Sequence, residues 1–282
     1  MAPRPRVASN RDGRRETTVG RLPPNRRSDK AGFVPAMFTD RRGGPPSDQE
    51  FEQALAGLRE QLSELQLPQI AHGRRAIILF EGPEGAGKKA ALRQLTAAFD
   101  PCHFAVHWTR HERRESGEGH WLARFWRQLP SAGNSAIFFR GWYRRVLDDR
   151  IFGRTDDNAV ARIFDEINEF EAQQRDYGTL IVKLYFDVAP EVQQPRLRER
   201  ASNPWGKIAQ RGEMIDVSDP LYATALKALR AYSDTRWSPW RMIDGNDERS
   251  ATLDALAAIA DAWAEAMPAE PPHLIENPIR VA

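Results

Sequence analysis

Residues 76–89, with the sequence AIILFEGPEGAGKK, constrain the fold more than any other stretch of this 282-residue chain. The run begins with consecutive apolar residues and no polar alternation, which is typical of a strand buried on both faces of a parallel sheet. It continues into a G-x-x-x-x-G-K spacing and then into a helix-forming run at 90–98. A strand, a glycine loop and a helix in this order predict backbone N–H groups that surround an anion, aided by the helix N-terminus and by Lys88. A glycine-rich turn that binds nothing is the plainer alternative.

Strand patterns and helix patterns alternate through the rest of the chain. Ser47 is a candidate N-cap for a helix whose apolar residues run from Phe51 to Leu65 at helical spacing. Alternation of this kind predicts an α/β fold, a doubly wound parallel sheet with helices on both faces. The further strands are expected at 104–109, 135–139, 180–188 and 240–243, and the further helices at 121–129, from about 143, and at 159–174, 190–200, 221–232 and 247–266.

Charge and composition divide the chain into a tail and one domain. Residues 1–45 carry eleven basic residues against four acidic ones, a net +7, so the remaining residues carry −5 of the total +2. The basic balance therefore comes from the tail and is no argument for a nucleic-acid-binding fold. With almost no aliphatic residues the tail cannot bury a core, and we expect a disordered Arg/Pro-rich tail at 1–46 rather than an organelle transit peptide. A single domain is expected at 47–268 and a C-terminal extension at 269–282.

The number of cysteines and the lengths of the apolar segments indicate the cellular compartment. Cys102 is the single cysteine, which excludes an intramolecular disulfide framework and suits a reducing compartment. Apolar runs do not reach the roughly 18 residues of a membrane span, and the N-terminus has no apolar segment of the kind that a secretion signal needs. These observations predict a cytoplasmic protein without a membrane partner.

The candidate site residues follow the ends of the predicted strands. Because ligands bind beyond the carboxyl ends of strands in such sheets, the glycine loop should share one site with Arg110, Arg140 and Asp187. The position after Lys88, usually Ser or Thr for a magnesium contact, is Lys89. Cations at this edge suit phosphoryl transfer, which needs positive charge around the transferred group, a carboxylate-held Mg²⁺ and a closing lid.

The carboxylate for a metal is the irregular part of this predicted site. A P-loop kinase usually has an Asp at the end of a strand next to the one that carries the glycine loop. Here the third strand ends in Phe139 instead. Glu84 and Glu81 are the nearest acidic residues in the sequence. Either could hold a metal through water, or Glu84 could cap the turn, and the sequence leaves these alternatives open.

Several collinear segments resemble the polyphosphate kinase type 2 family. They include FEGPEGAGKKAALRQL, HWLARFWRQLPSAG, AIFFRGWYRRVL and RWSPWRMIDGNDERSATL, and the similarity extends from about residue 73 to 266. The family's third-strand motif, Asp-Arg-Ser-Trp-Tyr, is matched by Arg140, Trp142 and Tyr143, while Phe139 replaces its metal-binding Asp. The family also usually has Asp at Glu84 and Gly at Lys89. This pattern is similar to the first of the two fused domains in polyphosphate:AMP phosphotransferases.

The resemblance implies a phosphotransferase that moves a phosphoryl group between inorganic polyphosphate and a nucleoside mono- or diphosphate (AMP, ADP or ATP class), with Mg²⁺. Lys88 would stabilise the transferring group, Glu84 would position metal or acceptor, and Arg140 would hold polyphosphate together with a short lid. A homo-oligomer is also implied. The implied phosphate-binding residues are Gly82, Gly85, Ala86, Gly87, Lys88, Lys89 and Arg110, and the lid residues are Lys207 and Arg211, matched only loosely at Asn203-Pro204-Trp205-Gly206-Lys207.

Two other functions fit the same residues. A catalytically impaired relative could bind polyphosphate or nucleotide and act as a regulatory or assembly partner, because the loss of a metal-placing carboxylate can forfeit orders of magnitude in rate. An ATP-dependent kinase of a small molecule or nucleotide on the same scaffold is the third alternative. Specific nucleic-acid binding is not expected.

Overall fold

The apolar run of the sequence forms strand β1 (Arg75–Glu81) at the centre of the sheet. In the computed structural model, which describes residues 44–109, 120–205 and 214–272, this sheet has five strands in the order β2-β3-β1-β4-β5. Each neighbouring pair is parallel. Six of the seven β1 residues are buried, as expected for a central strand with helices on both sides.

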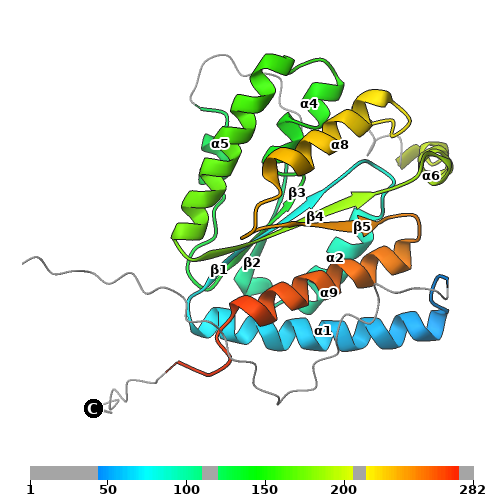
Figure 1. Ribbon diagram of the computed structural model, residues 1–282. Coiled ribbons are helices and arrows are strands. Elements are labelled where there is room, and N and C mark those ends of the chain that lie inside the picture. Colours follow the sequence, from blue (N-terminus) through cyan, green and yellow to red (C-terminus); the bar gives the residue numbers. More distant parts are fainter. Residues whose placement is uncertain (1–43, 110–119, 206–213, 273–282) are drawn as a thin grey trace, which may run out of the picture. The chain divides into compact units, whose positions relative to one another are not determined.

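Helices connect these parallel strands (Figure 1). The predicted α/β fold class, a parallel sheet covered by helices, is confirmed, whereas the predicted tail at 1–46 lies almost wholly outside the described residues. The strands are β2 (Phe104–Trp108), β3 (Ser135–Phe139), β4 (Thr179–Asp187) and β5 (Trp240–Asp244), and the helices are α1 (Asp48–Ala71), α2 (Lys88–Ala98), α3 (Ala123–Trp126), α4 (Asp148–Ile151), α5 (Asp157–Asp176), α6 (Pro190–Ser202), α8 (Pro220–Ser233) and α9 (Glu248–Ala266), with short 3₁₀ turns η1 (Pro101–His103) and η2 (Trp142–Arg145).

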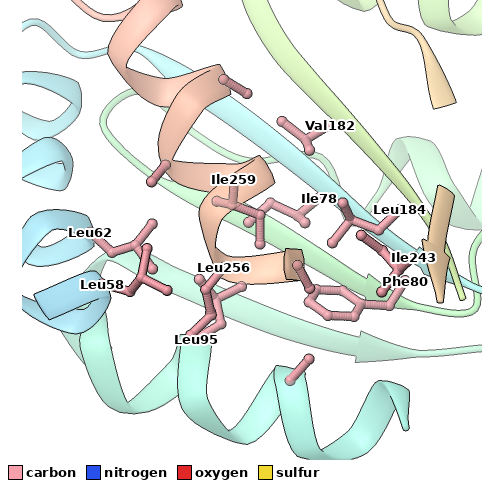
Figure 2. Packing of buried hydrophobic residues seen from close by; sticks show 14 of the residues in the cluster. Leu58, Leu62, Ile78, Phe80, Leu95, Val182, Leu184, Ile243, Leu256 and Ile259 are labelled. Atoms are coloured by element: carbon pink, nitrogen blue, oxygen red, sulfur yellow. The ribbon is translucent and has the colours of Figure 1, made fainter. Parts of the chain in front are cut away.

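Two hydrophobic cores cover the two faces of the sheet. Ile78 and Phe80 of β1 point to the face covered by α1, α2 and α9, where they pack with residues such as Leu62 and Leu256 (Figure 2). Their neighbours in sequence point to the opposite face, which is covered by α5 and α8. Successive side chains of a strand alternate between faces, so burial on both faces explains why the run is apolar without interruption.

The first helix begins where its sequence predicts. The Ser47 side chain accepts a hydrogen bond from the Glu50 amide, and the Glu50 carboxylate accepts one from the Ser47 amide at 2.9 Å. This reciprocal pair is a capping box. Within the described ranges, none of the helices combines the length and the apolarity that a membrane span requires.

Two predicted helices are shorter than expected because tertiary contacts override helix propensity. The segment 121–129 forms only α3, since Trp121 donates to Glu166 at 2.6 Å and the Trp126 ring packs edge-on against Phe170. The helix expected from about residue 143 is replaced by η2 and the one-turn helix α4.

The strand register places the glycine loop. Phe80 of β1 pairs with Phe139 of β3, and Glu81 pairs with Tyr185 of β4. The loop that leaves β1 therefore starts between the carboxyl ends of β3 and β4, which is where ligands bind in open parallel sheets.

Candidate functional site

Glycines give the loop after β1 a shape that other residues could not adopt. Gly82 has a φ of 120°, and a Cβ atom there would lie 2.1 Å from the carbonyl oxygen of Phe186. Gly87, the N-cap of α2, has a φ of 86°, in the left-handed region. Both are among the predicted phosphate-binding residues, and the structure brings 82–88 together in one loop at the N-terminus of α2.

Lys88 lies inside this loop and is only 4% exposed. Its ammonium group donates to the carbonyl oxygen of Gly82 at 2.6 Å and also to that of Pro83. Burial, together with the nearby guanidinium of Arg140, lowers the pKa of Lys88 to about 7, although nearby carboxylates such as that of Glu84 oppose the change. The predicted catalytic cation is thus held without a carboxylate hydrogen-bond partner among the described residues, in a place where an anion would restore its charged form.

Arg140 follows β3 and lies in the same site, and its backbone conformation is unusual. Its φ is 64°, and it is the one non-glycine residue with positive φ in the described part of the chain. Its guanidinium, which is buried, donates to Asp148 at 2.6 Å and to Glu84. The Asp148 and Glu84 carboxylates raise the pKa of Arg140 against the opposing effect of burial. Strain of this kind persists only where the surroundings fix it, and here two carboxylates do so.

Asp148 is a site residue that the sequence analysis missed. It is 5% exposed and also pairs with Arg144, whose Nε lies 3.1 Å from the Asp148 carboxylate. Burial raises the pKa of Asp148, while the two guanidinium groups lower it. The signal was present in the sequence, because Arg144 and Asp148 stand four residues apart, but such pairs are frequent on helix surfaces.

Glu81, the last residue of β1, is buried beneath the loop. Its carboxylate accepts a hydrogen bond from the backbone N–H of Gly141 at 2.6 Å. Burial raises the pKa of Glu81 to about 7, and the Gly141 hydrogen bond opposes that rise. Gly141 permits this contact, because a Cβ there would lie 2.8 Å from a Leu79 methyl carbon.

Phe139 occupies the end of β3, where the metal-binding Asp of the resembled family would stand. The centroid of its ring lies 5.9 Å from the Lys88 ammonium nitrogen. The neighbouring strand β4 does end in a carboxylate, Asp187, which accepts a hydrogen bond from the Tyr222 hydroxyl at 2.5 Å. The cation of the loop thus faces an aromatic ring from β3 instead of a negative charge.

A magnesium ion fits this site only as an ion shared with a phosphate ligand. The described residues contain no group of three or more His, Cys, Asp and Glu side chains placed to hold a metal. Glu84, however, has a buried carboxylate oxygen, Oε2, without a hydrogen-bond partner in that part of the chain, while its Oε1 accepts from Arg140. Mg²⁺ is usually held by one or two carboxylates together with substrate phosphates and waters. Of the two predicted metal residues, Glu84 suits that role better, because it is the one found with a buried carboxylate oxygen that lacks a hydrogen-bond partner among the described residues.

Other predicted residues lie apart or outside the described ranges. Lys89 is exposed on the first turn of α2, next to the loop. Arg110 and the two lid residues, Lys207 and Arg211, fall outside the described residues. Their predicted roles stay predictions.

Helix α6 contributes two further contacts that the sequence analysis did not anticipate. Gln193 donates to the carbonyl oxygen of Glu84 at 2.9 Å, and Arg196 donates to that of Gly85 at 2.7 Å. No local pattern of spacing pairs these residues, because they are more than 100 positions apart in sequence.

Comparisons with known proteins agree with this geometry. The family model described as Polyphosphate kinase 2 matches residues 46–271. A polyphosphate:AMP phosphotransferase of Pseudomonas syringae pv. tomato is 30% identical over 222 residues, which are 78% of this chain and 45% of that protein. An ADP-polyphosphate phosphotransferase of Rhizobium meliloti is 28% identical over 222 residues, covering 77% of this chain and 72% of that one.

Solved structures show the same relationship. The crystal structure of a polyphosphate kinase 2 from Arthrobacter aurescens TC1 superposes with a TM-score of 0.71 at 25% identity, covering 83% of this chain and 86% of that chain. The chain spans about half the length of the first curated relatives that it matches, for example 45% of the Pseudomonas syringae protein. The extent of the family match, together with the loop, Lys88 and Arg140 at the predicted edge, shows that this chain belongs to the polyphosphate kinase 2 family.

Proposed function

We propose that this protein transfers a phosphoryl group between inorganic polyphosphate and a nucleoside mono- or diphosphate. The observation that carries the proposal is the buried Lys88 beside the glycine loop, close enough to Arg140 at the end of β3 for the guanidinium to lower the pKa of Lys88. Phosphoryl transfer depends mainly on positioning and on cations that stabilise charge on the transferred group. The names of the relatives, which are polyphosphate phosphotransferases of AMP and ADP, support the same substrate classes.

The roles of the residues follow from their places. Lys88 and the loop amides bind the phosphates at the reacting end, and Arg140 neutralises charge beside them. Glu84, whose Oε2 atom has no hydrogen-bond partner among the described residues, is the residue that would hold Mg²⁺ together with substrate phosphates. The ion, when bound, offsets negative charge on the phosphates. Arg140 keeps Glu84 oriented, since it binds the other oxygen of that carboxylate.

A turnover assay tests this proposal. Purified protein, long-chain polyphosphate, Mg²⁺ and either AMP or ADP should yield ADP or ATP, and omission of Mg²⁺ should stop the reaction. Lys88→Ala should lower kcat by about 100- to 1,000-fold, the usual effect of removing one group that stabilises transition-state charge. Arg93→Ala, an exposed change one turn further along α2, is the matched control and should keep full activity.

The outcome also separates transfer from binding alone. The replacement of the third-strand Asp by Phe139 is the observation that would favour an impaired binder. Polyphosphate binding by a well-folded wild-type protein with no turnover of either nucleotide would contradict the proposed transfer and support that alternative. The names of the relatives favour transfer.

The compartment and the oligomeric state of the protein are also part of the proposal. We place it in the cytoplasm, a reducing compartment that suits its exposed free thiol, Cys102. We also propose a homo-oligomer, which light scattering of the purified protein can measure.

A further inference from the structure

Gln193 of α6 is fully buried and uses its whole side-chain amide to join two backbone segments. Its Nε2 atom donates to the carbonyl oxygen of Glu84 and to that of Ile215, both at 2.9 Å. Its Oε1 atom accepts from the amide of Val217 at 3.2 Å. The contact with the loop is close, since a Cβ on Gly85 would lie 3.2 Å from the Gln193 Cγ atom. A buried amide with all these partners fixes the position of what it binds.

Arg196, about one turn further along α6, holds the next carbonyl of the loop. One guanidinium nitrogen donates to Gly85 at 2.7 Å and to Gly245 at 2.6 Å, and the other donates to Asn246 at 2.7 Å. Its three acceptors are backbone carbonyls in two different loops. The planar fork of an arginine can make such contacts together, whereas a lysine ammonium is a single point of contact.

These two contacts set the direction of two backbone amides. In a trans peptide the C=O and the following N–H point in opposite directions. A carbonyl of Glu84 held by Gln193 therefore turns the N–H of Gly85 away from α6, and a carbonyl of Gly85 held by Arg196 does the same for the N–H of Ala86. Neither amide takes part in a hydrogen bond within the described ranges.

We propose that Gln193 and Arg196 are positioning residues that keep the loop in its anion-binding shape from behind, without touching the bound phosphates. The inference rests on the proposed function, because it assigns to α6 the task of orienting the amides that would bind polyphosphate. Arg196 acts through geometry and not through its charge, since its fork is already occupied by three carbonyls.

Polyphosphate binding by calorimetry, with long-chain inorganic polyphosphate as the probe, tests the two residues. Gln193→Leu and Arg196→Lys should each weaken binding roughly tenfold, and kcat/KM should fall by up to about 100-fold, as for a displacement of reacting groups by about 1 Å. The charge-retaining Arg196→Lys is decisive, because a residue that only attracts the anion would lose little in that change. Matched controls on the same helix are Gln194→Leu and the exposed Arg198→Ala, which should bind as the wild type does.

The salt dependence of polyphosphate affinity is a second measurement, and it distinguishes a positioning residue from one that contacts the phosphates directly. Each ionic contact with a polyanion adds to the slope of log Kd against log salt concentration. A positioning residue leaves the number of ionic contacts unchanged, so Arg196→Lys and Arg196→Gln should both keep the wild-type slope while Kd rises. A reduced slope in Arg196→Gln would overturn the proposal in favour of a direct contact.

The remaining outcomes are also decisive. Wild-type affinity in both Gln193→Leu and Arg196→Lys would overturn the inference, and so would a loss of binding that matches the unfolded fraction measured by thermal denaturation of each variant. If the wild-type protein itself does not bind polyphosphate, the proposed function is wrong. That result differs from a failure of the positioning inference, in which the wild type binds polyphosphate and the variants bind it equally well.

Discussion

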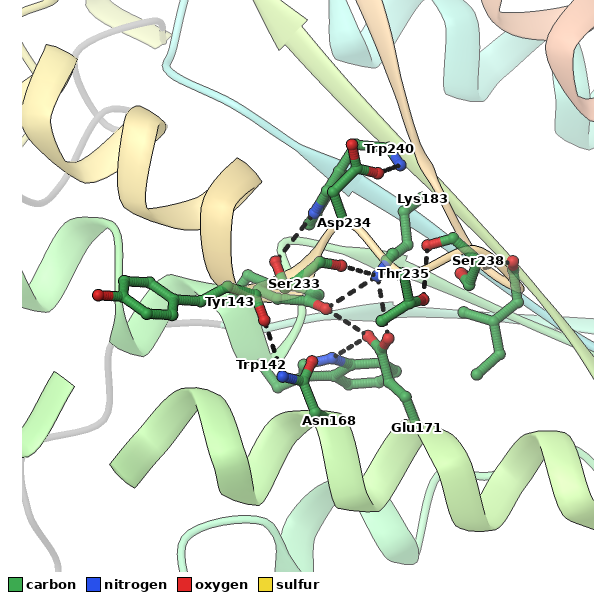
Figure 3. A network of polar contacts seen from close by, with 12 residues as sticks. Trp142, Tyr143, Asn168, Glu171, Lys183, Ser233, Asp234, Thr235, Ser238 and Trp240 are labelled. Carbon is green, nitrogen blue, oxygen red and sulfur yellow. Dashed lines mark hydrogen bonds and ion pairs between the residues drawn. The ribbon is translucent and has the colours of Figure 1, made fainter. Parts of the chain in front are cut away.

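Two buried lysines in this fold have very different surroundings. Lys183 of β4 is fully buried, and its ammonium donates to the Glu171 carboxylate at 3.1 Å, to the Tyr143 hydroxyl at 3.2 Å and to the Ser233 carbonyl at 2.7 Å (Figure 3). Lys88 of the loop binds only carbonyl oxygens of its own loop in the described part of the chain. Burial lowers the pKa of both lysines, but a carboxylate in hydrogen-bond contact opposes the change only at Lys183.

The polar network around Lys183 is closed on itself. The second oxygen of Glu171 accepts from the indole N–H of Trp142 at 2.9 Å and from the Tyr143 hydroxyl at 2.7 Å (Figure 3). Trp142 and Tyr143 follow Arg140 by two and three positions, so the network also anchors the turn that carries Arg140. A buried charge with a bonded counter-charge can stabilise an arrangement, whereas a buried cation without one in contact is costly, and a bound anion would reduce that cost. Lys183 therefore has a structural role, whereas Lys88 is the lysine that we propose binds phosphate.

Replacement of the two lysines by methionine should change the free energy of unfolding by very different amounts. Lys183→Met leaves the Glu171 carboxylate buried without its cation and should lower the free energy of unfolding by about 3–5 kcal/mol. Lys88→Met removes a buried charge that has no carboxylate hydrogen-bond partner among the described residues, so stability should change by less than about 1 kcal/mol. Chemical denaturation of the three proteins measures the difference.

A double variant checks the reason for that loss. Lys183→Met combined with Glu171→Gln removes both charges and keeps a side-chain oxygen for Trp142 and Tyr143. It should therefore be more stable than Lys183→Met alone. Equal losses in Lys88→Met and Lys183→Met would contradict the distinction between the two lysines.

The fold was largely predictable because its signals are local and periodic. The uninterrupted apolar run of β1, the capping box at Ser47 and the alternation of strands and helices each follow from neighbouring residues. The helix at 121–129 was overestimated because Trp121 and Trp126 bind a distant helix, α5, which no local pattern reports. Propensity is a weak signal where aromatic residues have tertiary partners.

The site was predictable only where the chain itself spaces its residues. The G-x-x-x-x-G-K spacing located Lys88, and the strand ends located Arg140. Asp148 was missed because its spacing from Arg144 is also frequent on ordinary helix surfaces. Gln193 and Arg196 were missed because their contacts with the loop join residues more than 100 positions apart and depend on the packing of α6 against it. Backbone carbonyls are their main acceptors at the loop, and a carbonyl has no residue type that a sequence could show.

Glu81 is a buried acid next to Lys88, the lysine that has no carboxylate hydrogen-bond partner among the described residues. Its pKa is about 7 in the folded protein against an ordinary value of 4.5. The folded state therefore binds more protons than the unfolded state between these pH values, so the carboxyl group costs stability progressively as pH rises from about 4.5 to 7, and fully above 7. Glu81→Gln should be more stable than the wild type by about 3 kcal/mol at pH 8 and by less than about 1 kcal/mol at pH 4.5.

Denaturation at both pH values measures this effect. A glutamine oxygen can still accept from the Gly141 amide, so the variant isolates the charge from the hydrogen bond. Asp176→Asn, at an exposed aspartate near the C-terminal end of α5, is the control and should show no comparable change between pH 4.5 and 8. A stability difference between Glu81→Gln and wild type that is the same at both pH values would show that Glu81 is not the titrating group.

The smallest predicted effect is a pH dependence of polyphosphate affinity, and it tests directly whether Lys88 is arranged to receive an anion. Its pKa is about 7 in the free protein, and a bound phosphate must raise that value. Above pH 7, binding therefore requires the uptake of a proton, and Kd should rise with pH by up to about tenfold per unit, or 1.4 kcal/mol. Calorimetry between pH 6.5 and 8.5 measures Kd, and buffers of different ionisation enthalpy count the protons.

Ionisation of Glu81 would also weaken polyphosphate binding as pH rises, so the slope of Kd against pH that persists in Glu81→Gln belongs to Lys88. It should vanish in Lys88→Arg, whose guanidinium stays protonated. A flat profile in the wild type would mean that Lys88, like Lys183, already has the negative partner it needs.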